Sequence, residues 1–143
     1  MQKKLIHDTW TMLLAGIALL AGNPAAADDA DKSGVIVTPL LEQNLTDLPG
    51  KEGLMVTVEV PPGAASDVHR HNAHVFVYQL TGSMVMQVQG GAPVTIHPGE
   101  TFYESPKDVH TVSKNASDSE PATFLVVFIK NKGAPPVLPA KKR

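Results

Sequence analysis

Three histidines stand at a spacing that suits a shared metal ion. His69 and His71 are separated by one residue, and His110 follows in a segment that contains the turn-forming Pro106. Successive side chains of a β-strand alternate between the two faces of a sheet, so His69 and His71 would point the same way. A turn at Pro106 would then bring His110 to the same point from a neighbouring strand. Neutral imidazoles that converge in this way form a transition-metal site.

The elements that would position these histidines are short β-segments separated by turn residues. The predicted segments are rich in β-branched and other apolar residues and cover residues 35–37, 54–60, 75–80, 83–88, 94–96, 101–103, 109–112 and 124–129. No helical period is sustained after residue 27. Strands of this length and spacing are typical of an antiparallel sandwich or a closed barrel. Gly63, Gly82 and Gly99 are expected at turns or bulges that need a positive φ or a close backbone approach.

The first 27 residues have the layout of a secretory signal peptide. Lys3 and Lys4 form a positive n-region, residues 12–21 are apolar, and three alanines precede Asp28. The apolar run is shorter than the roughly 20 residues that a transmembrane helix needs. We therefore expect cleavage after Ala27 and a periplasmic or secreted protein without membrane contact after cleavage. An uncleaved N-terminal anchor is the alternative.

The mature chain is predicted to hold one domain. Residues 28–34 are polar and are expected to form a disordered lead-in, and residues 35–132 are expected to form the barrel domain. Residues 133–143 contain three prolines and are expected to lie as an extended C-terminal tail or an edge arm. Such an arm could cross to a second subunit, so a homodimer is one option.

Charge and cysteine content exclude several classes of function. Without residues 1–27 the chain holds 10 Lys and Arg against 13 Asp and Glu, a net charge of −3. This balance argues against nucleic acid or an anionic membrane surface as a partner. The chain has no cysteine, which excludes thiolate catalysis and Cys-type zinc sites. Core packing, a metal or oligomerisation would then have to stabilise the exported domain.

Two segments resemble the paired motifs of the cupin superfamily. Residues 63–82 contain His69-x-His71, end in Tyr-Gln-Leu-Thr-Gly and are similar to the first motif. Residues 99–110 run from a glycine through a proline-containing turn to His110 and are similar to the second motif. The resemblance implies an all-β double-stranded β-helix, an antiparallel jelly-roll barrel, with a divalent metal bound by the three histidines.

The chain departs from the family pattern at three positions. Val75 stands where the first motif has a metal-binding Glu, and Lys107 and Lys114 replace the Gly and the Asn of the second motif, with Asn115 one place late. Without the Glu, three neutral imidazoles would surround the dication. Such a site would favour anionic substrates that chelate through oxygen or sulfur.

Glu104 is the candidate replacement for the missing carboxylate. In the family the strand positions of Phe102 and Glu104 point inward, so the resemblance implies a carboxylate inside the barrel. A buried Glu without a partner is costly. Glu104 would therefore be either a fourth metal ligand or the catalytic general base. A β-bulge that turns Glu104 to solvent is the alternative.

Two other histidines are less favoured as metal ligands. His74 has the opposite strand parity to the two histidines of the first motif. It would bind the same metal only if residues 72–73 form a loop that resets the alternation. His97 precedes a proline and a glycine and is expected to be a solvated turn residue.

Aromatic and methionine side chains are expected to build the core. Tyr78 and Tyr103 are assigned to the core, with a place in the pocket wall as the alternative. Met84 and Met86 alternate with Val85 and are expected on one buried strand face rather than as copper ligands.

Ligand types and family resemblance together imply a mononuclear metal enzyme that acts on a small chelating substrate. Similar cupins most often use Fe(II) with O₂ in dioxygenase-like oxidations, and Mn(II), Ni(II) or Zn(II) are alternatives. Three other functions stay open at this point. They are a non-catalytic cupin that binds a metal and a small ligand, a non-redox cupin decarboxylase or isomerase, and a structural module without metal.

Overall fold

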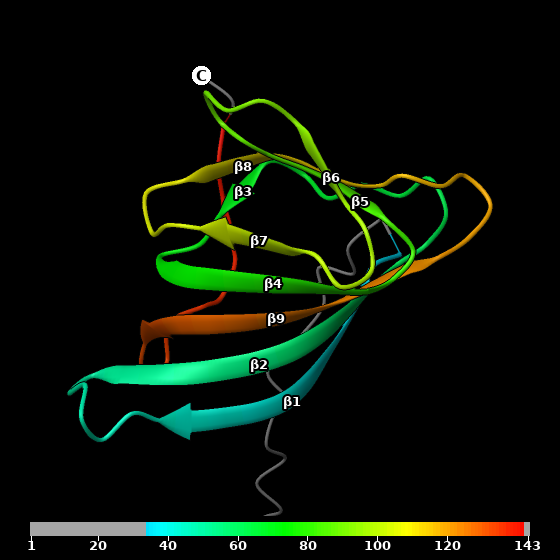
Figure 1. Cartoon of the computed structure of the whole chain (residues 1–143). Coiled ribbons are helices and arrows are strands. Elements are labelled where there is room, and N and C mark those ends of the chain that lie inside the picture. The colour runs from blue at the N-terminus through cyan, green and yellow to red at the C-terminus, as the bar shows by residue number, and fades with distance from the viewer. Residues whose placement is uncertain (1–33, 142–143) are drawn as a thin grey trace, which may run out of the picture.

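The computed structural model describes residues 34–141, which form two five-stranded antiparallel sheets (Figure 1). The first sheet has the order β1-β2-β9-β4-β7, with β1 Ile36–Asn44, β2 Lys51–Val60, β9 Ala122–Asn131, β4 Ala73–Thr81 and β7 Thr101–Glu104. The second sheet has the order β10-β3-β8-β5-β6, with β10 Leu138–Pro139, β3 His69–Arg70, β8 Val109–Asn115, β5 Met84–Val88 and β6 Val94–Ile96. The predicted all-β antiparallel jelly-roll barrel is confirmed.

Several expectations concern residues outside the described range. The expected signal peptide, residues 1–27, and residues 28–33 of the expected lead-in lie there, as do residues 142–143. Among residues 34–141, the structure has no helix with the length and apolar character needed to cross a bilayer.

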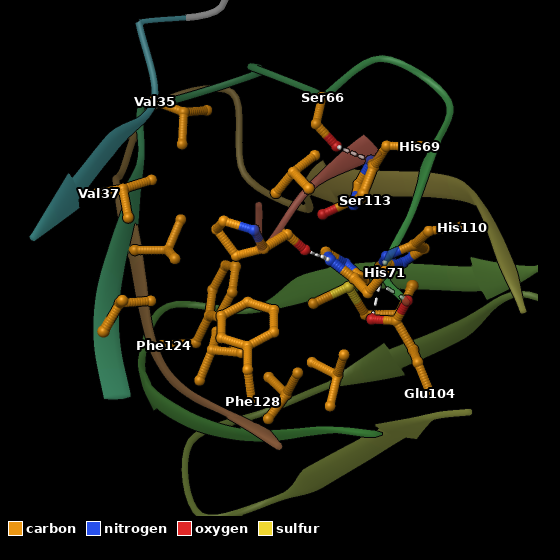
Figure 2. Close-up of a pocket in the computed structure, with 18 of the residues that line it drawn as sticks. Val35, Val37, Ser66, His69, His71, Glu104, His110, Ser113, Phe124 and Phe128 are labelled. Carbon is orange, nitrogen blue, oxygen red and sulfur yellow. Dashed lines mark hydrogen bonds and ion pairs between the residues drawn. The ribbon is translucent and has the colours of Figure 1, made fainter. Parts of the chain in front are cut away.

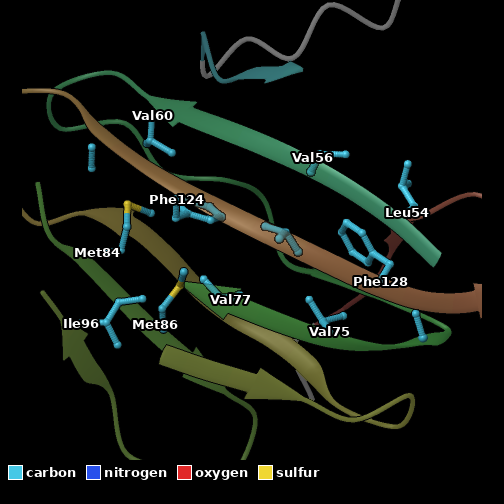
Figure 3. Packing of buried hydrophobic residues seen from close by; sticks show 13 residues of the cluster. Leu54, Val56, Val60, Val75, Val77, Met84, Met86, Ile96, Phe124 and Phe128 are labelled. Atoms are coloured by element: carbon cyan, nitrogen blue, oxygen red, sulfur yellow. The ribbon is translucent and has the colours of Figure 1, made fainter. Parts of the chain in front are cut away.

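The core lies between the two sheets, because alternation along the strands turns one face of each sheet inward. Residues of β4 and β9 are alternately buried and more exposed along most of each strand. The buried apolar side chains meet in one cluster (Figure 3): Leu54, Val56, Val60, Ala73, Val75, Val77, Met84, Met86, Ile96, Ala122, Phe124, Val126 and Phe128. The placement of Met84 and Met86 on one buried face is confirmed.

Tyr78 and Tyr103 are not in the core, and this prediction is wrong. Their side chains are 45% and 48% exposed. Both tyrosines alternate with inward-facing neighbours, since Val77 of β4 and Glu104 of β7 are buried. They therefore lie on the outer face of the first sheet.

The predicted turn glycines have the expected backbone. Gly63, Gly82 and Gly99 adopt φ values of 68°, 64° and 89°. At Gly82 a side chain would also meet the chain itself, because an added Cβ would lie 2.7 Å from the carbonyl oxygen of Pro121. Glycine is required there for both reasons.

Strand β8 contains one extra residue relative to its partner β5. Gln87 pairs with Val112 and Val88 pairs with His110, so two steps along β8 match one step along β5. A bulge of this kind shifts the inward–outward alternation by one residue. As a result His110 and Ser113, three residues apart, both line the barrel interior.

The same bulge accounts for the position of Asn115, one place later than in the second cupin motif. Asn115 is 0% exposed. Its side-chain amide donates to the carbonyl oxygens of Val60, Pro61 and Glu120 at 2.9–3.1 Å, and its Oδ1 accepts from the amide of Ser117 at 2.8 Å. Asn115 thus ties the end of β2 to the loop before β9.

Residues 133–140, which we call the C-terminal strap, fold back along the barrel. The start of the strap is held by a buried ion pair between Lys130 of β9 and Glu52 of β2, which pair across the two strands. Lys130 also donates to the carbonyl oxygen of Ala134 at 2.8 Å, and Glu52 accepts from the amide of Gly133 at 3.1 Å. The strap ends in β10, which pairs with β3. This part of the expected tail is therefore an edge strand of the second sheet.

Candidate metal centre

Three imidazoles meet inside the barrel (Figure 2). His69 on β3 pairs directly with His110 on β8, and His71 follows β3 with the same parity as His69. One potential ligand atom from each histidine lies within 4.8 Å of the other two. The ring centroid of His69 is 4.9 Å from that of His71 and 5.0 Å from that of His110. The structure thus brings together the three histidines that strand parity and the Pro106 turn predicted.

Two of these rings are oriented by backbone carbonyl groups. Nδ1 of His69 lies 2.7 Å from the carbonyl oxygen of Asp67, and Nδ1 of His71 lies 2.6 Å from that of Pro136 in the strap. A carbonyl oxygen can only accept a hydrogen bond, so each Nδ1 carries the proton and each Nε2 keeps a free lone pair. Metal-binding histidines adopt this arrangement, which fixes both tautomer and ring direction.

The third ring is oriented by a carboxylate. Nδ1 of His110 lies 3.2 Å from Oε1 of Glu104, and both side chains are only 3% exposed. Within the described residues, Nε2 of His110 and Oε2 of Glu104 are buried without a hydrogen-bond partner. Buried polar atoms without partners are costly. An ion bound by Nε2 of His110 would satisfy this nitrogen, so the donor set fits a transition metal.

Glu104 faces the barrel interior, and no bulge turns it to solvent: it is 2% exposed. Burial acts to raise the pKa of Glu104, but the hydrogen bond from His110 and the nearby imidazole charges outweigh it, so the pKa lies below its ordinary value. The carboxylate is therefore ionised at neutral pH. Its free Oε2 lies 3.7 Å from Nε2 of His71, so both roles considered for Glu104 are within reach of its position.

Burial lowers the pKa of His69, and the neighbouring His110 and His71 lower it further, although the Asp67 carbonyl and Glu104 act in the opposite direction. His69 therefore stays neutral at a lower pH than an ordinary histidine. Neutral imidazole is the form that binds metals.

His74 does not join the cluster. Its side chain is exposed, because β4 begins at Ala73 and turns Ala73 and Val75 inward, with His74 between them on the outer face. Residues 72–73 do not reset the alternation. Nδ1 of His74 lies 2.7 Å from the hydroxyl of Tyr103, and the two rings stack.

His97 occupies the exposed turn that the sequence predicted. Its Nδ1 lies 2.9 Å from Oγ of Ser83, and its backbone amide donates to the carboxylate of Glu100 at 2.7 Å.

Sequence reasoning missed the acceptors of the two first-motif histidines. Both acceptors are backbone carbonyl oxygens, so no residue type at position 67 or 136 signals them. The proline content of residues 133–143 did point to an edge arm, but not to its contact with His71.

The sequence of the barrel matches a known protein family. Residues 56–128 match the family model described as the cupin domain. The chain belongs to the cupin family. No curated protein sequence matches this cupin.

Solved structures agree on the fold. A conserved protein with a double-stranded β-helix domain from Klebsiella pneumoniae subsp. pneumoniae MGH 78578 has a TM-score of 0.61 and 19% identity, with 82% of this cupin and 90% of that chain covered. An oxalate oxidase in complex with the substrate analogue glycolate has a TM-score of 0.57 and 21% identity, with 79% and 58% covered. The dimethylsulfoniopropionate (DMSP) lyase DddQ from Ruegeria pomeroyi DSS-3 has a TM-score of 0.53 and 22% identity, with 60% and 42% covered. The cupin thus spans about half the length of these two enzymes. Sequence identities at this level show a shared fold and nothing about shared activity.

Proposed function

We propose that this cupin is a mononuclear metal-dependent enzyme that oxidises a small chelating substrate with O₂, as dioxygenases do. The observation that carries the proposal is the set of three buried or half-buried imidazoles. Each has its Nδ1 beside an oxygen acceptor, which leaves the lone pair of its Nε2 available for an ion. Fe(II) is the leading candidate, and Mn(II), Ni(II) and Zn(II) suit the same nitrogen ligands.

Each residue of the site has a distinct role in this proposal. His69, His71 and His110 would hold the ion. When bound, a redox-active ion would supply Lewis acidity and electrons for the reaction with O₂. Glu104 would either contribute Oε2 as a further ligand or accept a substrate proton at that atom. The apolar wall of the cavity, which includes Val75 and Val77, would keep bulk water away from the reacting groups.

A second candidate function is proton transfer without net oxidation, as in an isomerase, a decarboxylase or another lyase. The free Oε2 of the ionised Glu104 favours it, because a buried carboxylate beside a bound substrate is a suitable base. The structural neighbours include one protein named an oxidase and one named a lyase, so the fold serves both classes of reaction. A binding protein without turnover would use the same metal ligands.

The test begins with metal content. Full-length protein purified without chelators is analysed by mass spectrometry for bound metals, beside a variant with His69, His71 and His110 all changed to Gln. His74→Gln and His97→Gln are the matched controls. We expect about one equivalent of metal in the wild type and both controls, and none in the triple variant. Equal metal content in the triple variant and the wild type would overturn the proposed site.

The second step separates the candidate reactions. Oxygen uptake is followed with enediols, β-diketones, catechols and thiols. Uptake that depends on Fe(II) and is lost in the triple variant supports the dioxygenase. Conversion of a substrate without oxygen uptake supports the second candidate, and metal-dependent binding without conversion leaves a binding protein.

Export is also part of the proposal, and the composition of residues 1–27 supports it. When the full chain is expressed in a bacterium, we expect a periplasmic or secreted form whose mass corresponds to a first residue of Asp28. Recovery of only the uncleaved chain in the cytoplasm would contradict this.

A further inference from the structure

The candidate metal centre forms one end of a large cavity. The cavity has a volume of about 610 Å³ and lies between the two sheets, within the range of roughly 300–1,000 Å³ that is usual for small-molecule sites. Figure 2 shows His69, His71, His110 and Glu104 together on one side of the cavity, with Phe124, Val35 and Val37 on the other. A two-carbon chelator would fill only the polar end.

The rest of the cavity wall is apolar. Apart from the four residues of the metal centre, most of the lining side chains are valines, phenylalanines, prolines and a methionine, among them Val35, Val37, Val58 and Phe124. The polar lining residues outside the metal centre are Ser66, Asp67 and Ser113. The wall continues to the rim, where Val37 is 56% exposed. A ligand that reaches past the metal centre would therefore meet hydrocarbon.

Charge restricts the ligand further. Among the described residues that line the cavity there is no Lys or Arg, and the charged ones are Asp67 and Glu104. Lys130, a nearby interior cation, binds Glu52 and the strap and does not line the cavity. A carboxylate on the body of the ligand would lose its hydration without gaining a cation.

From this arrangement we infer that the site takes a ligand with one bidentate oxygen head and an apolar body, carrying at most one negative charge, at the head. The inference rests on the proposed metal centre, because the ion is what would bind the head. Substrates of this class include β-diketones and catechols with aromatic or branched aliphatic substituents. Dicarboxylates and polyhydroxylated sugar acids are disfavoured.

Binding of three hydroxamic acids with the same head tests the inference without turnover. Acetohydroxamic, benzohydroxamic and 4-carboxybenzohydroxamic acid are titrated by calorimetry into full-length protein loaded with Zn(II), a redox-inert ion. We expect benzohydroxamic acid to bind about 10- to 100-fold more tightly than acetohydroxamic acid, because its ring is buried against the apolar wall. The 4-carboxy compound should bind at least about tenfold more weakly than benzohydroxamic acid.

A charge placed at the rim provides a second measurement. Val37 lies across the cavity from the histidines (Figure 2), so Val37→Lys should strengthen binding of the 4-carboxy compound about two- to fivefold and leave acetohydroxamic acid unchanged. Ile36→Lys is the matched control: Ile36 directly precedes Val37 on β1, is 57% exposed and does not line the cavity. It should change neither affinity.

The outcomes distinguish this inference from the proposed function. If acetohydroxamic acid binds only in the presence of Zn(II) but the other two compounds bind equally well, the metal centre stands and the inferred ligand class is wrong. If no compound shows Zn(II)-dependent binding, the metal centre itself fails, and the inference fails with it.

Discussion

Glu104 lies directly opposite Val75 across the antiparallel β4–β7 pair. Val75 holds the position at which the first cupin motif has its metal-binding Glu. Both side chains are buried and line the same cavity. Opposite residues of an antiparallel pair have Cα atoms about 4.5–5.5 Å apart, so Glu104 supplies a carboxylate from the neighbouring strand at the same end of the cavity as Val75.

Exchange of these two residues should preserve the metal centre. Glu104→Gln should lower metal affinity about 10- to 100-fold, because His110 loses its charged acceptor and the site loses a negative charge. The double variant Val75→Glu with Glu104→Val should regain affinity to within about tenfold of the wild type. Affinity is measured by competition with a chromophoric chelator, with Glu59→Gln, an exposed residue of β2, as the control. Wild-type affinity in Glu104→Gln would show that the carboxylate has no part in metal binding.

Truncation of the strap should weaken the metal centre through His71. A chain ending at Ala134 keeps the Lys130 contact but lacks the Pro136 carbonyl that orients the ring of His71. We expect metal affinity to fall about tenfold, the lower limit for loss of such a partner. A chain ending at Ala140 is the control and should bind like the wild type. Circular dichroism checks that both chains fold; a folded chain ending at Ala134 with unchanged affinity would refute the role of the strap.

Asn115 should be important for stability, whereas its neighbour Lys114 should not. Asn115→Ala leaves three carbonyl oxygens and one amide without their side-chain partner, so we expect a loss of about 3 kcal/mol in the free energy of unfolding. Lys114 is exposed, and Lys114→Ala should change the free energy of unfolding by less than about 0.5 kcal/mol. Urea unfolding of both variants measures the difference, and similar losses would contradict the assignment.

The buried ion pair should make stability depend on pH. The hydrogen bond from Lys130 lowers the pKa of Glu52 below its ordinary value, against the effect of burial. On acidification the unfolded chain therefore takes up this proton first, at about pH 4.3, and folded Glu52 takes it up only at lower pH. The pair thus stabilises the fold at neutral pH, and this contribution is lost as the pH falls below about 4.3.

The double variant Glu52→Met with Lys130→Met provides the comparison for this pH dependence. Its free energy of unfolding should vary less between pH 5.5 and pH 3.5 than that of the wild type. Lys130→Met alone leaves a buried carboxylate without its cation, so it should be the least stable of the three proteins at pH 7. Parallel pH profiles for the wild type and the double variant would rule out the ion pair as the cause.

Local patterns predicted most of the barrel. Glycines with positive φ mark its turns, and the strict alternation of β4 and β9 follows from their apolar sequences. The same alternation places His69 and His71 on one face, whereas the inward position of Glu104 was implied by the cupin resemblance, with a β-bulge as the alternative. Strand alternation also predicts that His74 faces outward, and in the structure His74 is exposed. These features depend on strand parity, which is a property of the sequence itself.

Features that depend on distant partners could not be predicted in this way. The pairing of Glu52 with Lys130 joins residues 78 positions apart, and the contact of His71 with Pro136 joins residues 65 positions apart. The tyrosines were misplaced because aromatic side chains favour burial on average, whereas parity on β4 and β7 put Tyr78 and Tyr103 on the outer face. Pairing between distant residues therefore decided the first two features, and strand parity decided the position of the tyrosines.

The bulge at Thr111 lies between two parts of β8 that have different roles. His110 before it serves the metal centre, and Asn115 after it fastens two loops at the other end of the strand. Thr111 is the residue of β8 left unpaired between the pair of Val88 with His110 and the pair of Gln87 with Val112, so His110 and Asn115 both face the interior although they are an odd number of residues apart. In an unbroken strand these two residues would face opposite sides, so this single extra residue lets one strand serve both the metal centre and the loops that Asn115 joins.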